Sequence, residues 1–331
     1  MSTVAFCFGS RIIYWDSVII ALAAAAGSLA LPAFYLTREK KGSTLCLLAP
    51  IAMVLSFVIA RALFWYFHQE QYTGLWDAFA QLATGDYLLC GIVLGYLAAV
   101  GLLRLVGIER DSAFLLDASA APLSLCLALL RISSLFNNSC RGKVVITEPL
   151  LQRLPFSYPT LSSAGVLEYR YAAFFTEALL FALFAVVLAI LFVRFCPKEE
   201  ERRPAHVRSG DVFLFFLVLY SATELVIDST RNDATFSHLN AFVSVAQVLS
   251  AVTILAVLID FSQRSIKRRG LRTLHWALWS SYLVSLGGIG ACEYLVQRHG
   301  DWQLRCYGFM SLSVLLMLTV VWLLYRDSLN E

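Results

Sequence analysis

Nine long apolar segments constrain this chain more than any other feature. An α-helix needs about 20 mostly apolar residues to cross the hydrocarbon core of a membrane, and segments of about that length cover residues 17–36, 45–66, 87–105, 114–136, 172–193, 212–228, 239–260, 276–293 and 306–325. Of the 331 residues, 59% are hydrophobic and only 15% are charged. Soluble domains average about 45–50% and about 25%, so a soluble enzyme is excluded. The sequence predicts an all-α fold, a polytopic membrane helix bundle of about nine spans.

The distribution of Lys and Arg predicts the orientation of these spans. If the N-terminus is outside, the inner loops are residues 37–44, 104–113, 194–210 and 262–275, together with the C-terminal tail, and they carry sixteen basic residues. The outer segments carry eight. Because basic residues accumulate on the cytoplasmic side of a membrane protein, we expect the N-terminus outside and the C-terminus inside.

The net charge of +3 follows from this topology. Basic inner loops face an anionic leaflet, so the charge requires no nucleic-acid partner. The eight Cys form no CxxC pair and are typical of small apolar packing residues. We therefore expect no metal site and no cofactor.

Several charged residues inside the apolar segments lie at a similar depth. Arg61 and Arg131 each lie five residues from the outer end of their segments, and Glu177 lies five residues from the outer end of its own, which is about 8 Å along a helix. The sixth segment places further charges at its outer end: Glu224 and Asp228, with Arg231 just beyond. These groups either reach the interface or form a structural ion-pair network, or they line a polar chamber open to the outer leaflet, where arginines suit a lipid phosphate.

Residues 137–171 form the longest outer segment and contain three prolines. The segment is long enough to form a small extramembrane head above such a chamber. A plain connecting loop is the alternative interpretation.

A sequence signature begins close to Arg131. Residues 129–143 read LLRISSLFNNSCRGK and resemble the signature G-R-I-G-N-F-I-N-G-E-L-Y-G-R of the prolipoprotein diacylglyceryl transferases. Arg131, Ile132, Asn137 and Gly142 fall in register, and Lys143 replaces the closing Arg.

Three further stretches are similar to the family in order and spacing. Arg170 to Leu180 resembles R-H-P-S-Q-L-Y-E-A-L-L and includes Glu177. Tyr220, Asp228 and Arg231 follow the pattern Y-x3-R-x3-E-x2-R, and residues 246–250 resemble G-Q-L-L-S. The resemblance implies a family-like membrane core over residues 1–261, which includes the outer loop or head at 137–171. Residues 262–331 are then a cytoplasmic basic loop followed by two extra spans.

The resemblance also implies a reaction. Such enzymes move the diacylglyceryl group of phosphatidylglycerol to the Cys thiol of a prelipoprotein lipobox peptide, in the plasma (inner) membrane of bacteria. On this interpretation the catalytic candidates are Arg131, Glu177 and Arg231, with Arg131 the first candidate for the phosphate. The lipid-binding candidates are Arg61, Gly91, Asn137, Gly142, Glu224 and Asp228.

The chain departs from the family pattern at several positions. The family motif H-G-G-L falls near residues 89–93, where only Gly91 remains and no His is present. Ser134 and Ser139 replace an Asn and an acidic residue of the signature, and Glu224 stands where the family has Arg. A His that could act as a base is therefore missing. Either Glu177 or Glu224 takes the role of the base, or the reaction is lost or changed. In the second case the protein is an altered-substrate enzyme or a non-catalytic homologue that binds phospholipid or a lipoprotein partner.

Overall fold

The long helices coincide with the predicted apolar segments. The computed structural model describes residues 4–8, 11–38, 42–80, 87–136, 141–145, 152, 156–161, 165–197, 206–237, 240–298 and 302–329. In these ranges the long helices are α1 (Trp15–Tyr35), α2 (Ser43–Phe67), α4 (Leu89–Leu105), α5 (Ser112–Ser133), α6 (Ala173–Phe195), α7 (Asp211–Thr230), α8 (Val245–Arg269), α9 (Thr273–Arg298) and α10 (Gln303–Leu329). A short helix, α3, spans Leu75–Ala80.

Seven of the described helical segments are long and apolar enough to cross a membrane. The two predicted spans outside this set are α4, which has 17 residues, and α9, which is less apolar because it carries Ser, His, Glu and Gln side chains. The predicted all-α polytopic membrane bundle is confirmed. The count of nine spans and the orientation, with the N-terminus outside, stay predictions.

The seventh predicted span is displaced along the chain. It was expected at 239–260, whereas α8 begins at Val245 and continues to Arg269. The start is fixed by a capping box, in which the Ser244 hydroxyl accepts from the Gln247 N–H while the Gln247 side chain accepts from the Ser244 N–H. Such reciprocal bonds satisfy two donors at a helix start. The predicted basic inner loop is therefore largely helical.

In the described residues three β-hairpins lie outside the long helices, and the third takes up the first residues of the seventh predicted span. They pair β1 (Val4–Phe8) with β2 (Arg11–Tyr14), β3 (Ser157–Leu161) with β4 (Leu167–Tyr171), and β5 (Phe236–Ser237) with β6 (Asn240–Ser244). The second hairpin belongs to the segment predicted as an outer head. Its strands run antiparallel, with Ser157 opposite Tyr171.

The chain divides into two compact units, and each is described by itself. Unit 1 comprises Met1–Arg141 and Phe174–Glu200. Within it α1 packs along α5 and α2 packs along α4. The Ser124 hydroxyl of α5 donates to the Phe181 carbonyl of α6 over 2.8 Å, and the Phe192 ring of α6 packs against Phe34 and Phe114. These contacts join α6 to the other helices of the unit.

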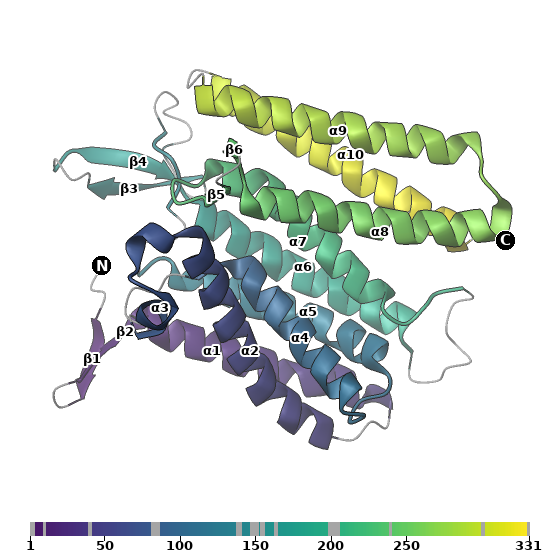
Figure 1. The fold of residues 1–331 in the computed structure, drawn as a ribbon, viewed down its shortest axis with the longest axis horizontal. Coiled ribbons are helices and arrows are strands. Elements are labelled where there is room, and N and C mark those ends of the chain that lie inside the picture. The colour runs from purple at the N-terminus through teal and green to yellow at the C-terminus, as the bar shows by residue number, and fades with distance from the viewer. Residues whose placement is uncertain are drawn as a thin grey trace. The chain divides into compact units, whose positions relative to one another are not determined.

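Unit 2 comprises Gly142–Ala173 and Glu201–Glu331. Its helices form a bundle in which α7 packs on α8, and α10 packs on α7, α8 and α9. Figure 1 shows α8, α9 and α10 side by side, in green to yellow. The hairpin of β3 and β4 belongs to the same unit.

An ion-pair network lies at one end of the unit 2 bundle, where α7 and α9 begin and α8 and α10 end. It was not predicted from the sequence. Asp211, which is fully buried at the start of α7, pairs with Arg264 and accepts a hydrogen bond from the Tyr325 hydroxyl. Asp327 of α10 pairs with Arg269 and with Arg272. Arg264, Arg269 and Arg272, three of the basic residues that predicted the inner side, are thus also structural partners within the bundle.

Candidate functional site

The catalytic candidates Arg131 and Glu177 form a buried ion pair in unit 1. Arg131 stands in the last turn of α5 and is 6% exposed, and Glu177 stands in the first part of α6 and is fully buried. The Arg131 Nε group pairs with the Glu177 carboxylate. A guanidinium offers five N–H donors in a planar arrangement, and a single carboxylate does not use all of them. The same planar arrangement suits the oxygens of a phosphate group. The structure therefore brings together two residues that are far apart in the sequence.

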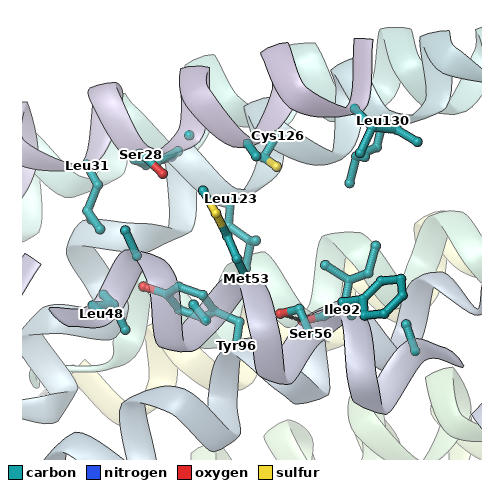
Figure 2. A pocket seen from close by; sticks show the side chains of 18 of the residues that line it. Ser28, Leu31, Leu48, Met53, Ser56, Ile92, Tyr96, Leu123, Cys126 and Leu130 are labelled. Carbon is teal, nitrogen blue, oxygen red and sulfur yellow. Dashed lines mark hydrogen bonds between the residues drawn. The ribbon is translucent and has the colours of Figure 1, made fainter. Parts of the chain in front are cut away.

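A cavity of about 540 Å³ lies in unit 1 among α1, α2, α4 and α5. Its wall is mostly aliphatic, and Figure 2 shows Leu123 and Cys126 on one side with Leu48 and Tyr96 on the other. Leu130, the neighbour of Arg131, also lines it. Volume and lining are typical of pockets that take apolar ligands. An acyl chain is apolar like the lining of this cavity.

Arg61 lies in the wall of this cavity and is 2% exposed. Its Nε group donates to the Ala78 carbonyl of α3 over 2.8 Å, and its guanidinium lies 5.5 Å from the centre of the Tyr72 ring. Both contacts stabilise a buried charge. They fix the direction of the side chain at the cavity wall, and the predicted contact with lipid phosphate stays a prediction.

Gly91 has a clear packing role in α4. A Cβ atom at this position would lie 2.8 Å from the Ala60 nitrogen and 3.0 Å from the Ala60 Cβ of α2. Membrane helices approach closely where small residues face each other. Gly91 therefore sets the distance between α2 and α4, beside the cavity that both helices line.

Replacing Gly91 with Ala is expected to lower the stability of the protein in detergent by about 1–3 kcal/mol, because the added methyl group meets backbone atoms that must shift. The matched control is Gly101→Ala in the same helix, where a Cβ would meet nothing within 4 Å. Thermal unfolding of both variants in the same detergent measures the difference. Equal melting temperatures would rule out the packing role.

Gly142 and Arg231 are neighbours in unit 2. They form an antiparallel bridge, and the Lys143 N–H donates to the Thr230 carbonyl over 2.7 Å. A Cβ at Gly142 would lie 2.5 Å from the Cβ of Tyr171, so only Gly permits this close approach. The signature glycine thus holds the end of α7 next to β4.

Arg231 connects two carboxylates at the end of α7. Its guanidinium lies 3.2 Å from the Asp228 carboxylate and 3.1 Å from that of Asp233. Asp228 is buried, and Glu224, one turn earlier in the same helix, is buried as well. Residues four apart lie on one face of a helix, so the two acidic candidates share a face of α7.

Asn137 lies outside the described residues. The other eight candidates are placed, with Arg61, Gly91, Arg131 and Glu177 in unit 1 and Gly142, Glu224, Asp228 and Arg231 in unit 2. Among the described residues no group of three or more His, Cys, Asp or Glu side chains could hold a metal ion. The expectation that the protein needs no metal or cofactor stays a prediction.

Two buried residues at this end of the unit 2 bundle were not among the candidates from the sequence. Glu293 of α9 is 2% exposed and accepts a hydrogen bond from Gln247 over 2.9 Å. Tyr307 of α10 donates to the Ser229 carbonyl over 3.2 Å. Glu293 is the last residue of the eighth predicted span. Like Asp228 in the sixth span, it lies at the predicted outer end, and this shared position could have indicated it.

Comparison with known sequences decides the family. The sequence model of the prolipoprotein diacylglyceryl transferases matches residues 3–261. The chain belongs to this family. The resemblance and the enzyme class that it implied are thereby confirmed, and the protein is a multi-pass membrane protein of a bacterial transferase family.

Individual relatives agree with the family assignment. The chain is 24% identical to the phosphatidylglycerol–prolipoprotein diacylglyceryl transferase of Bacillus licheniformis over 276 residues, which are 82% of this chain and 96% of that protein. The enzyme of the same name from Clostridium botulinum is 25% identical over 77% of this chain and 95% of its own length. That from Acaryochloris marina is 28% identical over 75% of this chain and 85% of its own length. These names give no support to the non-catalytic or altered-substrate alternative.

Proposed function

We propose that the protein transfers the diacylglyceryl group of phosphatidylglycerol to the lipobox Cys thiol of a prolipoprotein, at the outer leaflet of the bacterial inner membrane. The observation that carries this proposal is the buried pair of Arg131 and Glu177, two positions that match motifs of the family to which the chain belongs. The names of its relatives supply the donor lipid and the acceptor protein.

The chemistry needs one bond to form and one to break. The thiol gives its proton to a base, and the sulfur then forms a bond to the glycerol carbon of the lipid. The bond between that carbon and the phosphate oxygen breaks, and glycerol phosphate leaves with the electron pair. Because a free thiol has a pKa of about 8.5, a base is needed to remove its proton at neutral pH. Fixed cations stabilise the negative charge of the leaving phosphate.

Arg131 is assigned to the phosphate and Glu177 to the base, with Glu224 the alternative base. Glu177 is the first choice for the base because its carboxylate lies against the guanidinium of Arg131, so that base and cation are held at the same place. The aliphatic cavity of unit 1 receives part of the diacylglyceryl group, with Arg61 in its wall and Gly91 supporting it.

Arg231 stays a catalytic candidate in this proposal, and Asp228, Gly142 and Asn137 stay lipid-binding candidates. Residues 1–261 carry the reaction, with the segment 137–171 as an outer head. Residues 262–331 add a basic loop and two helices. The acceptor is the lipobox peptide, and no nucleic acid takes part.

The test is transfer by the purified protein to a reporter peptide with a lipobox Cys. Vesicles of phosphatidylglycerol are expected to raise the reporter mass by one diacylglyceryl group, whereas vesicles of phosphatidylethanolamine leave it unchanged. A reporter with Ala in place of the Cys is the control for the acceptor atom. Lipid binding without any change in mass would overturn the proposal, and transfer from the second lipid alone would indicate an altered donor.

A further inference from the structure

The end of the unit 2 bundle that holds the ion-pair network carries more positive than negative charge. The last two turns of α8, the corner Gly270–Arg272 and the last turn of α10 supply six basic side chains, which are Arg264, Lys267, Arg268, Arg269, Arg272 and Arg326. Among the described residues three carboxylates pair with members of this set, namely Asp211, Asp260 and Asp327. An excess of cations at one place attracts anions.

Three of the arginines take up all three carboxylates. The ion pairs are those of Arg264 with Asp211 and Asp260, and those of Arg269 and Arg272 with Asp327. Asp327 is 8% exposed, so its pairs are fixed inside the bundle. The negative charges of the network are therefore engaged by arginines that belong to the bundle itself.

Lys267, Arg268 and Arg326 carry the remaining positive charge. All three are exposed, and no carboxylate in the described part of the chain pairs with any of them. Arg268 Nη1 donates to the Ser328 carbonyl over 2.6 Å. A carbonyl is neutral, so this bond orients the guanidinium and leaves its charge in place. The other N–H donors of a guanidinium suit phosphate oxygens.

Three large apolar side chains are exposed directly after these cations in the chain. Leu271 is 59% exposed in the corner, and Leu274 and Trp276 are 40% and 65% exposed in the first turn of α9. Trp is enriched where a membrane meets water, because its ring system is apolar while its N–H is polar. Exposed cations beside such side chains are typical of a surface at the level of the lipid head groups.

We call this surface, formed by Lys267, Arg268, Leu271, Leu274 and Trp276, the basic corner. Its two kinds of side chain match one class of ligand, since an anionic phospholipid has a phosphate for the cations and acyl chains for the apolar groups. A free phosphate ion would use the cations alone. In a zwitterionic phospholipid an ammonium group offsets the phosphate, so the two cations attract it less.

We propose that the basic corner binds the head group of an anionic phospholipid, with the two cations at its phosphate and the apolar side chains against its acyl chains. The corner lies beyond the family match, which ends at residue 261. It is also separate from the site of the proposed reaction. Arg231 follows the last residue of α7, whereas Asp211 of the ion-pair network begins this helix of 20 residues, which is about 30 Å long. On the predicted orientation the corner faces the inner leaflet.

The experiment uses the full chain in vesicles of phosphatidylcholine and measures Trp fluorescence. A minor share of the lipid is replaced by phosphatidylserine or phosphatidylcholine with brominated acyl chains, because bromine quenches Trp fluorescence on contact. Phosphatidylserine is anionic and is not the proposed donor lipid. The chain has seven Trp residues, so Trp276→Phe is measured in parallel, and the difference from the wild type reports Trp276 alone. Phosphatidylserine is expected to bind there about tenfold more strongly than phosphatidylcholine.

The test variant is Lys267→Gln with Lys267's neighbour changed in the same way, Arg268→Gln. It is expected to lower the preference for phosphatidylserine to about twofold or less, with an unchanged unfolding temperature because both side chains are exposed. The matched control is Arg298→Gln with Arg305→Gln. It removes two exposed cations at the opposite end of α9 and α10 and is expected to keep the full preference.

Each outcome bears on one part of the proposal. Equal quenching of Trp276 by the two brominated lipids overturns the lipid site. A preference that survives the loss of Lys267 and Arg268 overturns their role, and a preference lost in the control variant shows that the net charge of the chain is responsible. Displacement of the lipid by an equal concentration of inorganic phosphate indicates an ion site and overturns the contact with acyl chains. None of these measurements depends on diacylglyceryl transfer, so the proposed function stands or fails separately.

Discussion

Changing Arg131 to Ala is expected to reduce diacylglyceryl transfer by at least about 10²–10³-fold, because the variant loses a cation for the leaving phosphate. It also leaves the Glu177 carboxylate without its ion-pair partner in a buried position. Removing one member of a buried pair typically costs about 3–5 kcal/mol of stability. Transfer to the reporter peptide and thermal unfolding in detergent measure the two effects separately.

A double variant separates catalysis from stability at this pair. Arg131→Met with Glu177→Leu replaces both charges with apolar side chains, which often restores stability, and transfer is expected to stay lost. Arg110→Ala is the control, since Arg110 is exposed and its removal is expected to change neither quantity. Full transfer by the double variant would mean that the pair is structural only.

Changing Gly142 to Ala is expected to have the second large effect. The new methyl group would meet Tyr171, whose Cβ lies 2.5 Å and whose carbonyl carbon lies 2.7 Å from the Cβ position. Backbone atoms of β4 must then shift, at a cost of about 1–3 kcal/mol. The bridge to Arg231 and the position of Lys143 depend on the same contact, so transfer is expected to fall as well.

The control for this variant is Gly287→Ala in α9, where a Cβ would meet nothing within 4 Å. Because Ala has a higher helix propensity than Gly, this change is expected to be neutral or to stabilise the protein by up to about 1 kcal/mol. Unfolding temperature and transfer are measured for both variants under the same conditions. A Gly142→Ala protein that behaves like Gly287→Ala would contradict the role given to the close approach.

The helical class of the fold and part of the candidate site could be predicted from the sequence. The length of an apolar segment directly reflects the thickness of the membrane, so the helices follow from residue counts. Depth follows in the same way, because each helical residue adds a fixed rise. For this reason the positions of Arg131 and Glu177 indicated a common depth, and the structure pairs them.

The remaining features depend on contacts between distant segments. The bridge between Gly142 and Arg231 joins a loop to the end of a helix, and no local pattern specifies which loop meets which helix. Glu293 lies in the eighth predicted span, but its contact with Gln247 depends on how α8 and α9 are rotated about their axes. The pairing of Asp211 with Arg264 depends on the packing of α7 against α8 in the same way.

The contacts of α9 and α10 at both ends of the unit 2 bundle have an evolutionary consequence. Without these helices, Gln247 would lose Glu293, the Ser229 carbonyl would lose Tyr307, and Arg269 would lose Asp327. Each buried polar group left without its partner costs about 1–3 kcal/mol. A descendant that deleted the two helices would need a compensating substitution at each contact. Removal of α9 and α10 would therefore destabilise the helices that match the family, although α9 and α10 themselves lie outside the match.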